Sequence, residues 1–172
     1  MGIHRLNHAV LYVRDVKRSV AFYTDVMGFR LINMLPDGFR GAAFLQAPGS
    51  TNDHDLGLFA IGDRAGASSA GRTTVGLYHL AWEVDTLAEL RRVAEVLTDN
   101  GALVGASDHG STKALYARDP DGLEFEVSWL VPADLLTDDV TMQTLPLDLD
   151  AAIARYGAET AGGIGVSTPA LR

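Results

Sequence analysis

The alternation of apolar and polar positions along the chain predicts short strands and amphipathic helices in a recurring order. Residues 6–13, LNHAVLYV, alternate with period two and are rich in β-forming side chains, so they predict a strand. Residues 15–28 carry apolar side chains at helical spacing between a capping aspartate and a terminal glycine, which predicts a helix. Three extended segments follow at residues 29–35, 41–47 and 54–61, with a turn at Pro36–Gly38, and complete the order β-α-β-β-β.

The same order begins again after a stretch of small, polar and glycine-rich residues. Residues 77–84 predict a strand, and the helix behind them begins at Thr86, where Glu89 has capping-box spacing, and ends at Gly101. Strands are predicted at residues 102–105, 113–118 and 123–129, with a tight Asp-Pro-Asp-Gly turn before the last one. The predicted organisation is therefore a first module at 3–62, a linker at 63–75, a second module at 76–130 and a C-terminal extension at 131–172.

The two modules are related by duplication, because NHAVLYV at residues 7–13 is repeated as YHLAWEV at residues 78–84. Neither module is large enough to bury its own sheet face. We therefore expect an α+β fold in which two βαβββ modules pair their sheets around a shared cup, with the helices outside, as one structural domain. In the extension, a short helix is expected at residues 149–156 and a frayed end at residues 157–172.

The last strand of the second module carries two acidic side chains on its polar face. Leu123, Phe125, Val127 and Trp129 alternate with Glu124, Glu126 and Ser128. One interpretation is an edge strand whose polar face is exposed to water. The other is that Glu126 is a metal ligand.

Composition and charge narrow the possible functions. The chain has 172 residues, 47% of them apolar, with 14 basic and 22 acidic residues and a net charge of −8. No basic cluster suited to nucleic acid or an anionic membrane is present, and no run approaches membrane-spanning length. Cysteine is absent, so thiolate metal sites are excluded, and no secretory leader is evident. We expect a cytoplasmic protein.

Two histidines occupy matching positions on the first strands of the two modules. Each of them alone is more typical of a structural histidine, but the identical placement of His8 and His79 favours a shared task. If the sheets pair as expected, both histidines converge with Glu126 in the cup. Two imidazoles and one carboxylate leave one side of a metal open, which is the facial arrangement of non-haem Fe(II) sites.

The chain resembles the vicinal oxygen chelate superfamily, and within it the one-domain type I extradiol dioxygenases, over about residues 3–130. The family's two histidine ligands match His8 and His79, and its glutamate ligand, ten residues beyond an active-site tyrosine, matches Glu126 beyond Tyr116. The family's acid/base histidine matches His54, and a further active-site histidine matches His109.

The resemblance implies an iron enzyme of aromatic catabolism that cleaves a catechol-type ring with O2. Fe(II) would be the metal, with Mn(II) as a possible substitute. His54 would remove and return a catechol proton, oriented by Asp53 or Asp55, while His109 and Tyr116 would donate hydrogen bonds where charge develops on oxygen. The cup walls would include Val10, Tyr12, Leu56 and Leu58. A homo-oligomer is expected, because oligomers are common in the family.

Two alternatives use the same scaffold. A glyoxalase-like or epimerase-like enzyme wants a fourth protein ligand on the last strand of the first module, and the repeat offset of 71 places that position near Asp55. A non-catalytic antibiotic-binding protein would need none of the matched residues. The presence of His8, His79 and Glu126 counts against this second alternative.

Overall fold

The computed structural model describes residues 2–3, 5–35, 41–70 and 73–163. By its internal contacts the chain forms two compact units. Unit 1 comprises residues 1–69 and 119–122, and unit 2 comprises residues 70–118 and 123–172. Within the described ranges, every helix is too short or too polar to cross a membrane.

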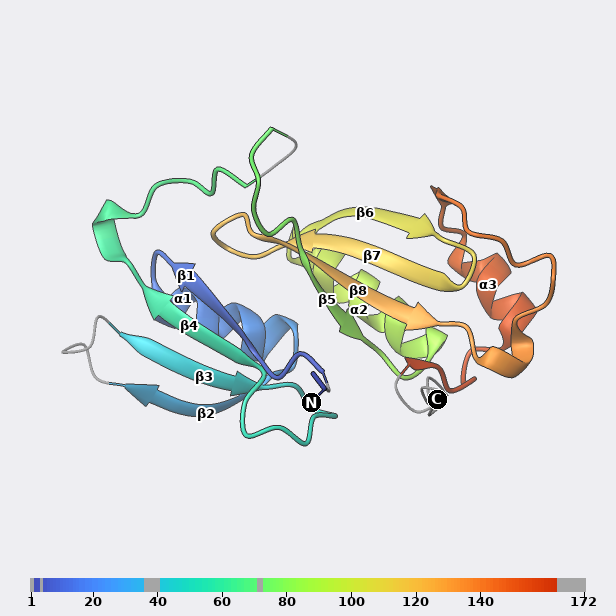
Figure 1. The fold of residues 1–172 in the computed structure, drawn as a ribbon, viewed down its shortest axis with the longest axis horizontal. Helices are drawn as coiled ribbons and strands as arrows, with labels where there is room; N and C mark the ends of the chain where they lie inside the picture. Colours follow the sequence, from blue (N-terminus) through green and yellow to red (C-terminus); the bar gives the residue numbers. More distant parts are fainter. Residues whose placement is uncertain (1, 4, 36–40, 71–72, 164–172) are drawn as a thin grey trace. The chain divides into compact units, whose positions relative to one another are not determined.

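Unit 1 contains a four-stranded sheet in the order β1-β4-β3-β2 (Figure 1). Its strands are β1 (Ala9–Val13), β2 (Arg30–Leu35), β3 (Ala42–Gln46) and β4 (Leu56–Ala60). Only the β1–β4 pair is parallel. Helix α1 (Val16–Ala21) is capped by the Asp15 carboxylate and continues as a π-helical turn over Phe22–Val26. The predicted β-α-β-β-β order is confirmed.

One face of this sheet packs on α1 and forms the core of unit 1. Leu11, Leu45, Leu56 and Leu58 are buried there. The expectation that Leu56 and Leu58 line the cup is therefore wrong. Val10 pairs with Gly57, so the neighbouring positions 56 and 58 point to the opposite face, because side chains alternate along a strand.

Unit 2 contains a five-stranded sheet in the order β5-β8-β7-β6-β9, again with one parallel pair, β5–β8. Figure 1 labels the strands β5, β8, β7 and β6 of this sheet. Its strands are β5 (Leu80–Glu83), β6 (Leu103–Asp108), β7 (Thr112–Arg118), β8 (Glu124–Leu130) and β9 (Leu145–Pro146). Helix α2 (Leu87–Asp99) packs on this sheet with the predicted stripe Leu87, Leu90, Val93 and Leu97, and Thr86 caps it. Helix α3 (Leu149–Tyr156) has the predicted bounds.

The turn between β7 and β8 has the predicted chemistry. Gly122 adopts a φ of +81°, a conformation that favours glycine, and its N–H donates to the Asp119 carbonyl at 2.9 Å. This turn fixes the register of the hairpin, in which Tyr116 lies directly opposite Glu126. The interval of ten residues between these two side chains thus places them on the same face of the sheet.

Some predicted boundaries need correction. β1 begins at Ala9 and β5 begins at Leu80, immediately after the two histidines. The pairing of β1 with β4 and of β5 with β8 starts only at these two residues. β6 extends to Asp108, three residues beyond the prediction, since it pairs with both β7 and β9. The predicted turn at Pro36–Gly38 and residues 164–172 of the predicted frayed end lie outside the described residues. For residues 157–163 the prediction of a frayed end is wrong, because hydrogen bonds such as that from the Gly162 N–H to the Asp85 carbonyl hold them against unit 2.

Candidate metal and acid/base site

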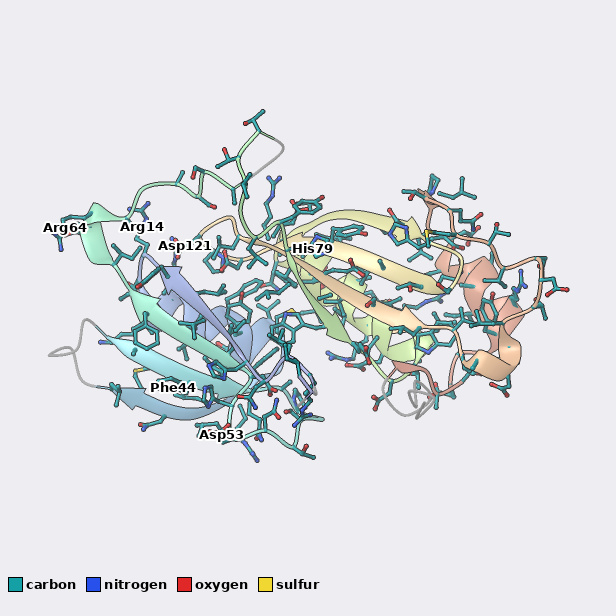
Figure 2. All side chains as sticks on the ribbon, in the orientation of Figure 1. Arg14, Phe44, Asp53, Arg64, His79 and Asp121 are labelled. Atoms are coloured by element: carbon teal, nitrogen blue, oxygen red, sulfur yellow. The ribbon has the colours of Figure 1, made fainter. Side chains whose placement is uncertain are left out.

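In unit 2, the strands bring His79 and Glu126 together. His79 lies immediately before β5 (Figure 2), and Glu126 lies opposite Ala81 in the parallel β5–β8 pair, so both side chains are on the same face. The His79 Nε2 atom lies 3.3 Å from the Glu126 Oε2 atom. The histidine side chain is one quarter exposed, and the glutamate side chain is less exposed than that.

This pair fits the donor set of a divalent metal. Two adjacent ligands that each bind one metal at about 2.1 Å lie about 3 Å apart, close to the separation of these two atoms. The His79 Nδ1 atom is buried and has no hydrogen-bond partner among the described residues. The ring therefore has one nitrogen directed at a carboxylate and one buried nitrogen without a hydrogen-bond partner among the described residues, and a buried polar atom left without a partner costs free energy.

Tyr116 and His109 adjoin this pair. Tyr116 lies opposite Glu126, and its ring centroid is 5.8 Å from that of His79. Its hydroxyl is 2.8 Å from the His109 Nε2 atom. Burial, followed by the negative charge of Glu126, raises the pKa of Tyr116 above its ordinary value. The phenol therefore stays protonated at neutral pH and keeps a proton to donate.

In unit 1, His8 and His54 lie together. Their ring centroids are 4.6 Å apart, and the ring of Phe44, labelled in Figure 2, stands edge-on to that of His54 with centroids 5.1 Å apart. The His54 Nδ1 atom is 3.2 Å from the Asp53 Oδ2 atom. The hydrogen bond that the backbone N–H of His54 donates to the Asp53 carboxylate at 3.0 Å lowers the pKa of the exposed Asp53, so Asp53 carries a charge beside the imidazole. Of the two carboxylates expected to orient His54, the structure places Asp53 there.

The face of the unit 1 sheet away from α1 is apolar and aromatic. Val10 and Tyr12 are exposed on β1, and Phe44 and Phe59 stand edge-on to each other at 5.9 Å on β3 and β4. A Cβ atom at Gly57 would meet Val10, Phe44 and Phe59, which shows that these side chains share one face. Val10 and Tyr12 thus lie on the exposed face of this sheet, and their place in the wall of a cup stays a prediction.

Asp55 has a structural task in this unit. It is buried, and its carboxylate accepts hydrogen bonds from the Ala47 N–H at 2.8 Å, the Ser50 hydroxyl at 2.8 Å and the Asn52 side-chain amide at 2.7 Å. These bonds hold the loop between β3 and β4. The carboxylate is thus occupied within the loop.

Strand pairing also moves the fourth-ligand position away from Asp55. Ala81 pairs with Glu126 in unit 2, while Val10, the repeat partner of Ala81, pairs with Gly57 in unit 1. The first repeat is two residues longer between its histidine and this position, so the constant offset of 71 leads to the wrong residue. Gly57 has no side chain that could bind a metal.

The structure thus brings together two local groups of predicted site residues. His79, Glu126, His109 and Tyr116 meet in unit 2, and His8 and His54 meet in unit 1. Within the described parts of the chain, no three His, Asp or Glu side chains are grouped to hold a metal, so the complete triad stays a prediction.

Two partners of His109 were not predicted from the sequence. The backbone carbonyl of Gln143 and the hydroxyl of Thr144 lie 3.0 Å and 3.4 Å from its Nδ1 atom. A backbone carbonyl carries no signal in the residue type, so only the path of the chain could reveal this contact.

Comparison with known proteins gives the family. Residues 5–127 match the Glyoxalase/Bleomycin resistance protein/Dioxygenase superfamily. The chain is 26% identical over 158 residues to the catechol-2,3-dioxygenase of Bacillus subtilis (strain 168), which covers 90% of this chain and 53% of that protein. It thus spans about half the length of that relative.

Two further similarities concern shorter proteins. The chain is 30% identical over 137 residues to the lactoylglutathione lyase of Salmonella typhimurium, with 72% of this chain and 90% of that protein covered. A solved glyoxylase/bleomycin resistance protein/dioxygenase domain from Frankia sp. EAN1pec superposes with a TM-score of 0.66 at 22% identity, covering 77% of this chain and 96% of that one. The family match, together with two sheets built from βαβββ modules, shows that the chain belongs to the glyoxalase/bleomycin resistance protein/dioxygenase superfamily.

Proposed function

We propose that this protein is an extradiol dioxygenase that cleaves a catechol-type ring with O2 and uses a divalent metal, Fe(II). The observation that carries the proposal is the group formed by His79, Glu126, Tyr116 and His109, in which a metal-binding pair adjoins a protonated phenol and an imidazole. His8, His79 and Glu126 would hold the metal, and Mn(II) would fit the same donors. Bound there, the metal would supply open positions for both ring oxygens and for O2.

The remaining residues bind substrate and move protons. The aromatic face of unit 1, with Phe44 and Phe59, suits a flat aromatic ring. His54, beside the charged Asp53, would take the second catechol proton and return it later. The Tyr116 hydroxyl would stabilise negative charge as it develops on a substrate oxygen.

The absence of a side chain at Gly57 supports the dioxygenase over a four-ligand enzyme. An isomerase of the glyoxalase kind would want a fourth protein ligand on the last strand of the first module. The register of β1 and β4 places glycine there, and Asp55 is occupied by its own loop. Three ligands leave the metal more open positions for substrate and O2 than four do.

A second candidate is supported by one comparison. The Salmonella lactoylglutathione lyase matches over 90% of its own length at 30% identity. We therefore keep a glyoxalase-like lyase as the alternative. Cytoplasmic location and assembly into a homo-oligomer stay predictions.

The test is anaerobic reconstitution of the chain with Fe(II), followed by air and a panel of catechols. We expect oxygen uptake together with a yellow semialdehyde product. Glu126→Gln should lower turnover at least about 100-fold, while the matched change Glu124→Gln on the same strand should preserve it. Glu124 is paired with Arg118 rather than with His79.

A different set of results would replace the dioxygenase with the glyoxalase-like lyase. A chain that binds metal stoichiometrically, consumes no oxygen with any catechol and forms lactoylglutathione after loading with Zn(II), Ni(II) or Co(II) would replace the proposal with the lyase.

A further inference from the structure

The C-terminal extension, which lies beyond the family match, runs along the site in unit 2. β9 pairs with the end of β6, with Leu145 opposite Asp108 and Pro146 opposite Ser107. This pairing carries the preceding residues past the turn that connects β6 to β7. His109 lies in this turn.

The hydrogen bonds of His109 determine which of its nitrogens carries the proton. Its Nδ1 atom lies 3.0 Å from the Gln143 carbonyl oxygen, and a carbonyl oxygen can only accept, so Nδ1 donates. In the neutral ring Nε2 is then unprotonated and accepts a hydrogen bond at 2.8 Å from the Tyr116 hydroxyl, whose single proton is shared with the Glu126 carboxylate. We infer that the Gln143 carbonyl is a positioning group that holds His109 in the Nδ1–H tautomer and makes its Nε2 the proton acceptor of Tyr116.

The turn around His109 is built to keep this geometry. The Asp108 carboxylate accepts the Gly110 N–H at 2.7 Å and the Lys113 ammonium at 2.6 Å, and that ammonium also donates to the Gly110 carbonyl at 2.9 Å. Lys113 is buried, and the Gln143 side chain hydrogen-bonds to Asp108 as well. The turn and the extension are therefore joined by several bonds besides the one to His109.

Close backbone packing adds to this constraint. Gly110 has a φ of +81°, and a Cβ atom there would overlap the carbonyl oxygen of Thr141. Only glycine lets the extension approach the turn so closely. A side chain at residue 110 would push residues 140–143 away and remove the acceptor from His109.

The tautomer gives His109 a role different from the one that the resemblance implies. In the inferred Nδ1–H tautomer the Nε2 atom of His109 carries no proton, so it accepts from Tyr116 and does not donate. If the proposed function holds, a substrate hydroxyl can pass its proton to the Tyr116 oxygen while the Tyr116 proton moves to Nε2. The imidazolium that forms still donates from Nδ1 to Gln143, and the reverse transfer restores both residues.

The direct test is a long-range ¹H–¹⁵N NMR spectrum of the metal-free full chain, with His109 assigned by comparison with His109→Asn. We expect a protonated Nδ1 and an unprotonated Nε2 at neutral pH. A spectrum in which His109 is the Nε2–H tautomer would overturn the inference without any variant.

Three variants separate the possible causes. Gly110→Ala should lose the exclusive Nδ1–H signal, whereas Gly122→Ala, with the same φ of +81° and no atom within 4 Å of its Cβ, should keep it. Thr144→Val should also keep it, and a change of tautomer there would assign the role to the Thr144 hydroxyl instead. If Gly110→Ala does not fold, the wild-type spectrum still shows which nitrogen of His109 carries the proton.

Activity distinguishes this inference from the proposed function. In the Fe(II)-loaded chain, Gly110→Ala should lower kcat about 10-fold to 100-fold with little change in KM, as is typical when a group behind an active-site residue is lost. No turnover of any catechol by a chain with the Nδ1–H tautomer would overturn the proposed function and leave the inference standing. Turnover of a catechol by a chain with the Nε2–H tautomer would overturn the inference and leave the proposed function standing.

Discussion

At the scale of residues, two carboxylates related by the repeat offset have different tasks. Glu126 faces His79, while Asp55 accepts three hydrogen bonds inside its own loop. Asp55→Ala should cost about 1–3 kcal/mol of unfolding free energy, because it leaves buried donors unpaired. It should leave the metal content per chain unchanged.

Metal analysis of the reconstituted, purified variant and urea denaturation check both parts of this prediction, with Glu126→Ala as the variant that loses metal. Loss of metal from Asp55→Ala to the same extent as from Glu126→Ala would favour a four-ligand site instead.

Asp108 and Lys113 form a second pair that the sequence did not single out. Burial alone would raise the pKa of Asp108, but the hydrogen bonds from Lys113 and from the Gly110 N–H bring that pKa below its ordinary value. Asp108→Asn leaves a buried ammonium without a counter-charge, so we expect a loss of about 3 kcal/mol at pH 7.

The dependence of this loss on pH has a definite sign. A carboxyl group with a depressed pKa in the folded protein stabilises the fold above its ordinary pKa, and this contribution disappears as the pH falls through the folded value. The difference between wild type and Asp108→Asn in urea denaturation should therefore be full at pH 7 and shrink below about pH 4. The exposed Asp138→Asn is the control, and an equal difference at pH 7 and pH 3 would contradict the assignment.

At the scale of elements, local patterns predicted most of the fold. Period-two alternation and the Asp-Pro-Asp-Gly turn were enough to predict the hairpin of β7 and β8, and its observed register puts Tyr116 opposite Glu126. The stripe of α2 and its cap at Thr86 follow equally from helical spacing. These features depend on residues that are near in sequence, so the local pattern of residue types is sufficient to predict them.

What the sequence did not predict depends on contacts between distant segments. The two-residue strand β9 has no periodicity, and its pairing with β6 follows from the path of the extension. The position in the first module that corresponds to Glu126 is Gly57 and not Asp55, because the first repeat is two residues longer between its histidine and this position. This difference in length shows only in strand pairing. The acceptor for His109 is a backbone carbonyl, which any residue type could have supplied.

At the scale of the whole molecule, the predicted site residues are distributed over two units. Unit 1 holds His8 and His54 with an aromatic face, and unit 2 holds His79, Glu126, Tyr116 and His109. Neither repeat alone contains all the residues that the proposed chemistry uses. The pairing of the sheets into one cup, which would complete the triad, stays a prediction.

The C-terminal extension is part of the fold of unit 2 and not only a neighbour of His109. The Trp129 indole N–H donates to the Thr160 carbonyl at 3.1 Å, and the Gly162 N–H donates to the Asp85 carbonyl at 2.7 Å. A Cβ atom at Gly162 would overlap the Trp129 indole nitrogen and the Leu130 carbonyl oxygen. The extension therefore packs closely against the end of β8.

This packing predicts the effect of adding one methyl group. Gly162→Ala should lower the unfolding free energy by about 1–3 kcal/mol, because neither the buried indole nor the backbone of β8 can move away without loss. Gly49→Ala is the matched control, since a Cβ there meets no atom within 4 Å and both changes restrict the unfolded chain similarly. Urea denaturation followed by tryptophan fluorescence measures both variants, and equal midpoints would show that the extension does not depend on this contact.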